Sequence, residues 1–166
     1  ESETFPNSFK SNANLAGIVF PQNVTKTASA AFQKTGMTSV TLLKGISYGS
    51  NAFDSCASLV SVTVEEGVTE IGNYMFQNTK LTSVTLPNSV TKIGASAFNG
   101  CSLTTINFGQ GVKTIENSAF QNCGELTEII LPDATETLGQ NAFGDCPKLA
   151  KISLGKNMKT LEAYCF

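Results

Sequence analysis

Apolar residues recur along the chain at a nearly constant interval, and a Phe marks each interval most clearly. Each marker Phe closes a unit that opens with Leu or Met, and the length from opening to Phe is equal in every unit except the slightly shorter second one. Because a unit this short cannot bury its own apolar face, the pattern predicts a stack of similar coils. The units run from Leu15, Met37, Leu59, Leu81, Leu103, Leu126 and Leu149 to Phe32, Phe53, Phe76, Phe98, Phe120, Phe143 and Phe166, and Phe9 extends the Phe series.

Each unit begins with the alternation expected of a short strand. In the fourth unit, Leu81, Val84 and Leu86 are apolar, and Ser83 and Thr85 alternate with them. Successive strand side chains point to opposite faces, so the apolar set faces the interior and the hydroxyl set faces outward. A residue such as Pro87, which has no N–H to donate to a ladder, ends the strand.

The rest of each unit is expected to return to the start of the next. Val90 and Ile93 point back to the core, and Gly94 suits a tight bend. The sequence "ASAF" at 95–98 is expected to form about one turn of α- or 3₁₀-helix that drives Phe98 inward. Stacking then predicts ladders of like residues, listed here as Leu59/Leu81/Leu103, Val62/Val84/Ile106 and Phe76/Phe98/Phe120.

The outward strand positions form a candidate face for binding a protein partner. Its residues are Ser39, Thr41, Ser61, Thr63, Ser83, Thr85, Thr105, Asn107, Glu128, Ile130, Lys151 and Ser153. Thr and Ser also favour exposed strands without any binding role. Binding hot spots are enriched in Trp, Tyr and Arg, and none of these is on the face. Glu128 beside Lys151 is expected to form an exposed ion pair between coils.

Composition removes several classes of function. The net charge is −2, every basic residue is Lys, and no cluster of them forms a stripe that would neutralise nucleic-acid phosphates. His, the commonest general base and metal ligand at neutral pH, is absent from the sequence. The sequence therefore predicts no catalytic residue, no metal or cofactor site and no enzyme.

Four cysteines share one position, shortly after the marker Phe, and Thr35 and Thr79 hold that position in two other units. A straight column with steps of about 5 Å cannot converge on tetrahedral zinc, and its parallel Cβ vectors disfavour disulfides. Buried free thiols are the expectation for Cys56, Cys101, Cys123 and Cys146. Cys165 lies outside this column and is expected to be the most reactive.

The repeat pattern L-x-x-[VI]-x-[LF]-[PG]-x-x-V-x-x-I-[GE]-x-x-A-F-x-x-C, clearest at 59–161, resembles the BspA-like leucine-rich repeats. The resemblance implies a right-handed leucine-rich-repeat solenoid with a parallel sheet of about seven short strands and helical or 3₁₀ turns on the other side. It also implies a cell-surface or secreted protein that adheres to host or neighbouring-cell proteins. It carries no catalytic residues over to this chain.

The same resemblance and the ends of the sequence suggest one solenoid domain over 1–166, with irregular units at 9–53 and regular units at 59–166. The chain begins without Met and stops in mid-repeat, so it is expected to be part of a longer array. No apolar run is long enough to predict membrane insertion. The apolar edge that the repeat leaves uncovered at Phe166 predicts edge-to-edge self-association. A passive spacer and an intracellular regulator remain as alternative functions.

Overall fold

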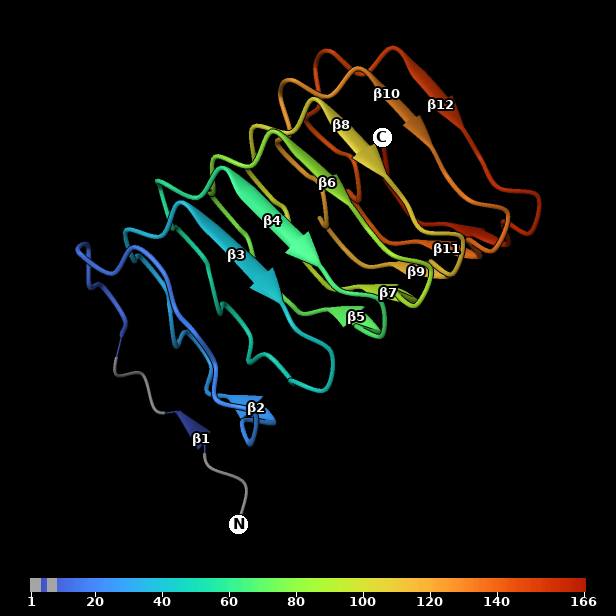
Figure 1. Ribbon diagram of the computed structural model, residues 1–166. Coiled ribbons are helices and arrows are strands. Elements are labelled where there is room, and N and C mark those ends of the chain that lie inside the picture. The colour runs from blue at the N-terminus through green and yellow to red at the C-terminus, as the bar shows by residue number, and fades with distance from the viewer. Residues whose placement is uncertain (1–3, 6–8) are drawn as a thin grey trace.

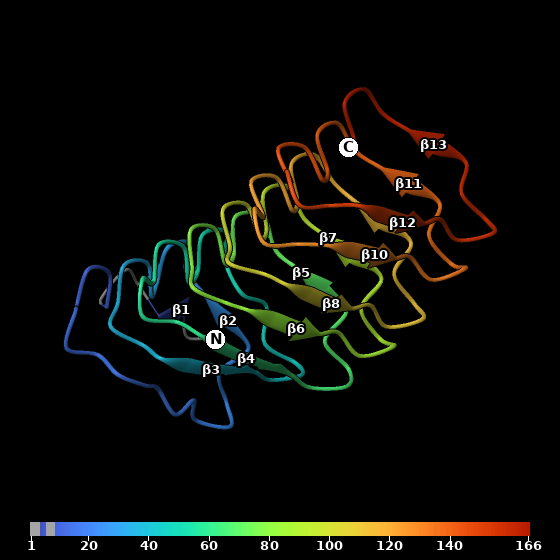
Figure 2. The same ribbon diagram turned by 90° about the horizontal axis from the view of Figure 1, so that it is seen from above.

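The computed structural model describes residues 4–5 and 9–166 and shows a single stack of coils, about one repeat in each coil (Figure 1). The stack twists gradually from one end to the other, and its strands lie in two rows on different sides (Figure 2). All strand pairs are parallel, as the repeat predicts. The residues that connect the ends of the coils form a third side, which consists of turns.

The first row contains the predicted outward-facing strands. They are β3 (Ser39–Leu42), β4 (Ser61–Val64), β6 (Ser83–Thr85), β8 (Thr105–Asn107), β10 (Glu128–Ile130) and β12 (Lys151–Ser153). They pair in twos, β3 with β4, β6 with β8 and β10 with β12, whereas the pairs themselves lie side by side without strand pairing. The row therefore has two internal seams, between β4 and β6 and between β8 and β10.

The first unit departs from the predicted seven strands, because residues 15–20 form no strand in the structure. Gly17 holds the position of Ser39 and Ser61 in this unit. Glycine loses more backbone entropy on being fixed in a strand than other residues do, and it brings no side chain to pack. Val19 is 93% exposed as a result of this open geometry. The row has six strands among the described residues.

A second row lies on the return leg, and the sequence did not predict it. Its strands are β2 (Lys26–Thr27), β5 (Glu70–Ile71), β7 (Lys92–Ile93), β9 (Thr114–Ile115), β11 (Thr137–Leu138) and β13 (Thr160–Leu161). β5 to β13 form one five-stranded sheet, and β2 pairs instead with β1 (Thr4–Phe5). Two-residue strands contain a single polar–apolar step, so no alternation could identify them.

The prediction of helical or 3₁₀ turns is wrong, since the described residues contain no helical segment. At 95–100 the backbone makes successive turns, with positive φ at Ser96 (53°) and Gly100 (71°). The N–H groups of Ser96, Phe98 and Gly100 donate to carbonyls of the following coil at 2.8 to 3.0 Å. A helix would use these donors within its own coil, so hydrogen bonding between coils excludes it.

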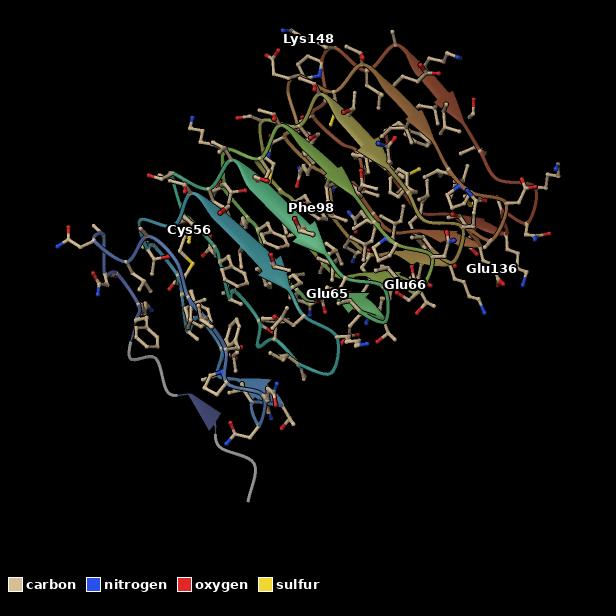
Figure 3. All side chains as sticks on the ribbon, in the orientation of Figure 1. Cys56, Glu65, Glu66, Phe98, Glu136 and Lys148 are labelled. Atoms are coloured by element: carbon tan, nitrogen blue, oxygen red, sulfur yellow. The ribbon has the colours of Figure 1, made fainter. Side chains whose placement is uncertain are left out.

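Stacked Phe rings form the core, as predicted. Consecutive marker rings from Phe32 to Phe143 lie 5.1 to 5.6 Å apart between centroids, with interplanar angles of 2° to 19°. Phe9 and Phe166 extend the column at 5.7 and 6.1 Å. Phe98, labelled in Figure 3, is fully buried in the middle of the stack. The Leu ladder is also fully buried, whereas Val62 and Ile106 of the third ladder are only partly buried.

Candidate functional site

The twelve outward residues predicted from the sequence lie on one side of the first strand row, here called the strand face. Pairing places like positions beside each other, with Ser39 opposite Ser61, Ser83 opposite Thr105 and Glu128 opposite Lys151. Ten of the twelve are exposed, and Glu128 and Ser153 are half-buried. The structure therefore brings the candidate residues together, in two columns along the stack.

The chemistry of the strand face changes along its length. Its residues on β3, β4, β6 and β8 carry only hydroxyl and amide groups. The Asn107 amide donates to the Thr85 hydroxyl oxygen at 3.3 Å, which links two coils within this uncharged part. On β10 and β12 the face becomes charged and apolar, with an ion pair between Glu128 and Lys151 and with Ile130 exposed by 61%. A partner therefore meets two different surfaces.

Shallow depressions mark the junctions where strands are not paired. One lies over the seam between β4 and β6, and its walls are the residues of these two strands together with Val60. A larger one lies over the seam between β8 and β10, where Phe108, Ile130 and Pro132 supply apolar surface and Gln110 and Asp133 supply polar groups. Sequence reasoning missed Phe108 as a surface residue because it occupies an inward position of the repeat.

A set of ion pairs around the perimeter joins coils six and seven, the coils of the units that open at Leu126 and Leu149. Each pair joins an acid of coil six to the Lys at the equivalent position of coil seven, in the pairs Glu125–Lys148, Glu128–Lys151, Asp133–Lys156 and Glu136–Lys159. A hydrogen bond from Lys156 lowers the pKa of Asp133, and one from Lys159 lowers that of Glu136. The sequence predicted only the second of these pairs.

The cysteine column lies inside the stack and contributes hydrogen bonds between coils. The thiols of Cys101, Cys123 and Cys146 donate to the carbonyl of the marker Phe one coil earlier, at 3.1 to 3.3 Å. All five cysteines are free. Cys56, Cys101 and Cys123 are buried as expected, whereas Cys146 is only partly buried. Burial raises the pKa of Cys101 to about 11 and also raises that of Cys123.

The burial of Cys165 runs against the expectation that it is the most reactive cysteine. Its side chain is only 6% exposed, because it occupies the inward position that Ala142 holds one coil earlier. Cys146, at the surface end of the column, is the more accessible thiol. Membership of the cysteine column therefore did not indicate which cysteine side chain is the most exposed.

Among the described residues, no group of three or more His, Cys, Asp or Glu lies close enough to hold a metal ion. Within the same residues, no helix has the length and apolar character needed to cross a membrane. What the geometry provides is an extended surface for contacts.

A family comparison identifies the repeat. The model for BspA-type leucine-rich repeat regions matches residues 2–48 and 46–166, with 6 copies. The chain belongs to this family. BspA-type repeats build solenoids, whose extended surfaces serve protein–protein interaction. A comparison with curated proteins found no match.

Solved structures of other leucine-rich repeat proteins resemble the chain. A leucine rich cell surface protein of Faecalibacterium prausnitzii A2-165 is 28% identical with a TM-score of 0.55, covering 86% of this chain and 48% of that chain. The T. pallidum leucine-rich repeat protein is 27% identical with a TM-score of 0.68, covering 84% of this chain and 64% of that chain. The pneumococcal vaccine antigen PcpA is 20% identical with a TM-score of 0.55, covering 82% of this chain and 44% of that chain, and shows the shared fold alone. The chain thus spans roughly half to two thirds of the first two proteins.

Proposed function

We propose that this BspA-type solenoid is a cell-surface or secreted adhesion module that binds a protein partner through its strand face. The observation that carries the proposal is that the twelve predicted residues lie on six neighbouring strands of one row. An extended face without a deep pocket suits another macromolecule better than a small molecule.

The composition of the face indicates how such binding works. Hydroxyl and amide groups from β3 to β8 offer many hydrogen bonds, each of modest net free energy. The face has no Trp, Tyr or Arg, the residues that most often act as binding hot spots. Ile130, together with Phe108 in the depression beside it, is the apolar anchor that the face does offer. Affinity then depends on many weak contacts and on several copies acting together.

The location of the protein is part of the same proposal. The F. prausnitzii protein that resembles the chain is described as a cell surface protein. Buried thiols with raised pKa are compatible with an oxidising environment, because little thiolate forms in the folded protein. A passive spacer and an intracellular regulator are the alternatives. Neither of them requires the strand face to bind a protein outside the cell.

The test replaces Ser83 and Thr85 by Lys in one variant. Both side chains are exposed on β6, so the strand keeps its inward packing while two positive charges enter the face. The matched control is Ser58→Lys with Ser102→Lys, just outside the strand row, where the equivalent positions already carry Lys80 and Lys148. Capture of a panel of extracellular-matrix and cell-surface proteins is measured by surface plasmon resonance.

The proposal predicts that Ser83→Lys with Thr85→Lys lowers capture by tenfold or more at unchanged thermal midpoint, while the control pair leaves capture intact. A drop of this size corresponds to about 1.4 kcal/mol or more, which two misplaced charges readily supply. Equal capture by both variants would exclude this part of the face, and absence of any capture by the unmodified protein would favour the spacer.

A further inference from the structure

One arrangement of side chains on the second strand row occurs twice along the stack, and a lysine fills only the first copy. The first copy lies in coils three to five, where β7 pairs with β9. Its centre is Gly94, with Asn73 one coil earlier and Glu116 one coil later. The Ala95 N–H, next to Gly94, donates to Asn73 Oδ1 and to Glu116 Oε2, both at 3.0 Å.

Lys92 completes the first copy. It is the polar residue of β7, and its ammonium nitrogen lies 2.8 Å from Glu116 Oε1. Because the Ala95 N–H donates to Oε2, each oxygen of the Glu116 carboxylate binds one donor. The hydrogen bond that Lys92 donates to Glu116 raises the pKa of Lys92, which favours its charged form.

A second copy lies two coils further on, with the same backbone hydrogen bonds. Gly139 is its centre, with Asn117 one coil earlier and Glu162 one coil later. The Gln140 N–H donates to Asn117 Oδ1 at 3.0 Å, as the equivalent N–H does in the first copy. The Glu162 N–H donates to the preceding coil at 3.0 Å, and the equivalent N–H of the first copy does so at 2.9 Å. The carboxylate of Glu162 therefore starts from the same place in the fold as that of the first copy.

The lysine is missing from the second copy. Thr137 of β11 holds the position that Lys92 holds on β7, and Glu162 forms no ion pair among the described residues. A pocket of about 480 Å³ lies over Gly139, and Thr137, Gln140 and Glu162 are among the residues that line it. A side chain at Gly139 would force the backbone apart, since its Cβ would lie 2.5 Å from a backbone nitrogen of the preceding coil. The second copy therefore has the acid and the space, without the cation.

We infer that the pocket beside Glu162 binds the side-chain ammonium of a lysine on a partner protein. The filled copy supplies the geometry, in which the ammonium donates to one carboxylate oxygen and the backbone N–H, here that of Gln140, donates to the other. Arginine fits this geometry less well, because a guanidinium prefers to bind both oxygens of a carboxylate at once. Glu162 and Gln140 are exposed, so a residue on the surface of a partner reaches the pocket. The site lies on the second strand row and does not depend on binding by the strand face.

Blocked amino acids serve as probes on the full chain. Nα-acetyl-lysine methylamide carries the ammonium group, and Nα-acetyl-norleucine methylamide has the same alkyl chain without it. Binding is followed in ¹⁵N NMR spectra through the backbone amide shifts of Thr137, Gln140 and Glu162. Since an exposed ion pair contributes little free energy, we expect the lysine analogue to bind about two- to fivefold more tightly than the norleucine analogue.

An exchange of residues between the two copies is the sharpest test. Thr137→Lys gives the second copy the lysine of the first, so it should abolish the shifts at Gln140 by filling the pocket. Lys92→Thr empties the first copy, so the lysine analogue should now shift the amide of Ala95 as well. Both substituted positions are half-buried and face away from the core, so the inward packing of the strands is unchanged.

A pair of acids separates the pocket from charge alone. Glu162→Gln removes the charge at the pocket and should abolish the preference for the lysine analogue. Glu66→Gln makes the same change at an exposed acid that lies outside the pocket, and it should leave the preference intact (Figure 3).

Other results would overturn the inference. These are equal binding of the two analogues, shifts at Gln140 that survive Thr137→Lys in a folded variant, or an equal loss of preference in Glu66→Gln and Glu162→Gln. Tighter binding of butylammonium, which carries the same charge without a peptide backbone, would assign the pocket to a free amine and exclude a lysine of a partner protein as its occupant.

Discussion

The rings of Phe120 and Phe143 lie almost parallel, with an angle of 2° between their planes and 5.1 Å between their centroids. The two residues are one full coil apart in the sequence. The N–H of Phe120 donates to Ala142 O at 2.7 Å, so the backbone and the side chain are held in the same register. This double constraint, repeated in each coil, explains why the unit length is constant where the coils stack.

Replacing Phe98 by Ala tests the contribution of one ring. Phe98 is fully buried between Phe76 and Phe120, so its removal leaves a cavity that the two neighbouring coils cannot close. We expect a loss of about 3–5 kcal/mol in the free energy of unfolding, measured by urea denaturation. Phe98→Leu, which keeps most of the volume, should cost clearly less, and equal losses would argue against a cavity as the cause.

A substitution at Gly109 tests how closely its coil approaches the preceding coil, at the residues that follow the first strand row. A Cβ at this position would lie 2.1 Å from Pro87 O, so Gly109→Ala must push the backbone of the neighbouring coil away. We expect destabilisation of at least about 1 kcal/mol, seen as a lower thermal midpoint. Gly124→Ala is the control, because its Cβ would meet nothing within 4 Å. Similar midpoints for the two variants would contradict the contact.

The thiol column predicts an order of reactivity. Burial raises the pKa of Cys101 to about 11, so very little of the reactive thiolate exists at pH 8. Iodoacetamide followed by mass spectrometry should modify Cys146 first and Cys101 and Cys123 only on unfolding. Rapid modification of Cys101 in the folded protein would show that the column is open to solvent.

The ion pairs between coils six and seven predict sensitivity to acid. The pKa of Asp133 and that of Glu136 are lowered in the folded protein, so their stabilising effect is present above the unfolded pKa of about 4 and is lost as pH falls through the lower folded values. The thermal midpoint should therefore fall on acidification below about pH 4, and added salt should weaken the same pairs.

A charge swap separates these pairs from general acid effects. Glu136→Lys and Lys159→Glu should each lower the thermal midpoint at pH 7, and the double variant should recover most of the loss. Additive losses in the double variant would mean that Glu136 and Lys159 do not interact in solution.

Much of the fold could be predicted because the repeat carries it. The spacing of Phe76, Phe98 and Phe120 alone specified the ring column, and the alternation around Val84 specified the strand and its outward side. Binding by the strand face remains a prediction, since exposure shows access and not recognition.

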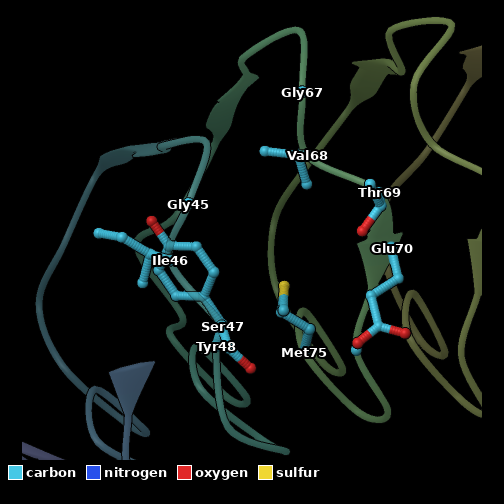
Figure 4. A pocket seen from close by; sticks show the side chains of 10 residues that line it. Gly45, Ile46, Ser47, Tyr48, Gly67, Val68, Thr69, Glu70 and Met75 are labelled. Atoms are coloured by element: carbon cyan, nitrogen blue, oxygen red, sulfur yellow. The ribbon is translucent and has the colours of Figure 1, made fainter. Parts of the chain in front are cut away.

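The remaining features depend on contacts between coils that no single unit reveals. The second strand row has one polar–apolar step in each coil, and the turns around Phe98 are favoured over helix only by N–H groups that donate to the next coil. The pairing of strands in twos has no counterpart in the repeat pattern. A pocket of about 300 Å³ between Gly45–Tyr48 and β5 (Figure 4) follows from the shorter second unit and from Tyr48, whose combined effect depends on the neighbouring coil.

The most direct test of the whole account is a nuclear Overhauser spectrum of the chain with selectively labelled Phe rings. Stacking in register predicts cross-peaks between consecutive rings of the column, from Phe53 to Phe76, Phe98, Phe120 and Phe143, at centroid distances of 5.1 to 5.6 Å. Two further cross-peaks are expected within single coils, between Phe20 and Phe32 and between Phe108 and Phe120. Cross-peaks that skip a coil, or rings without any inter-ring contact, would contradict the stacking on which the proposed binding by the strand face depends.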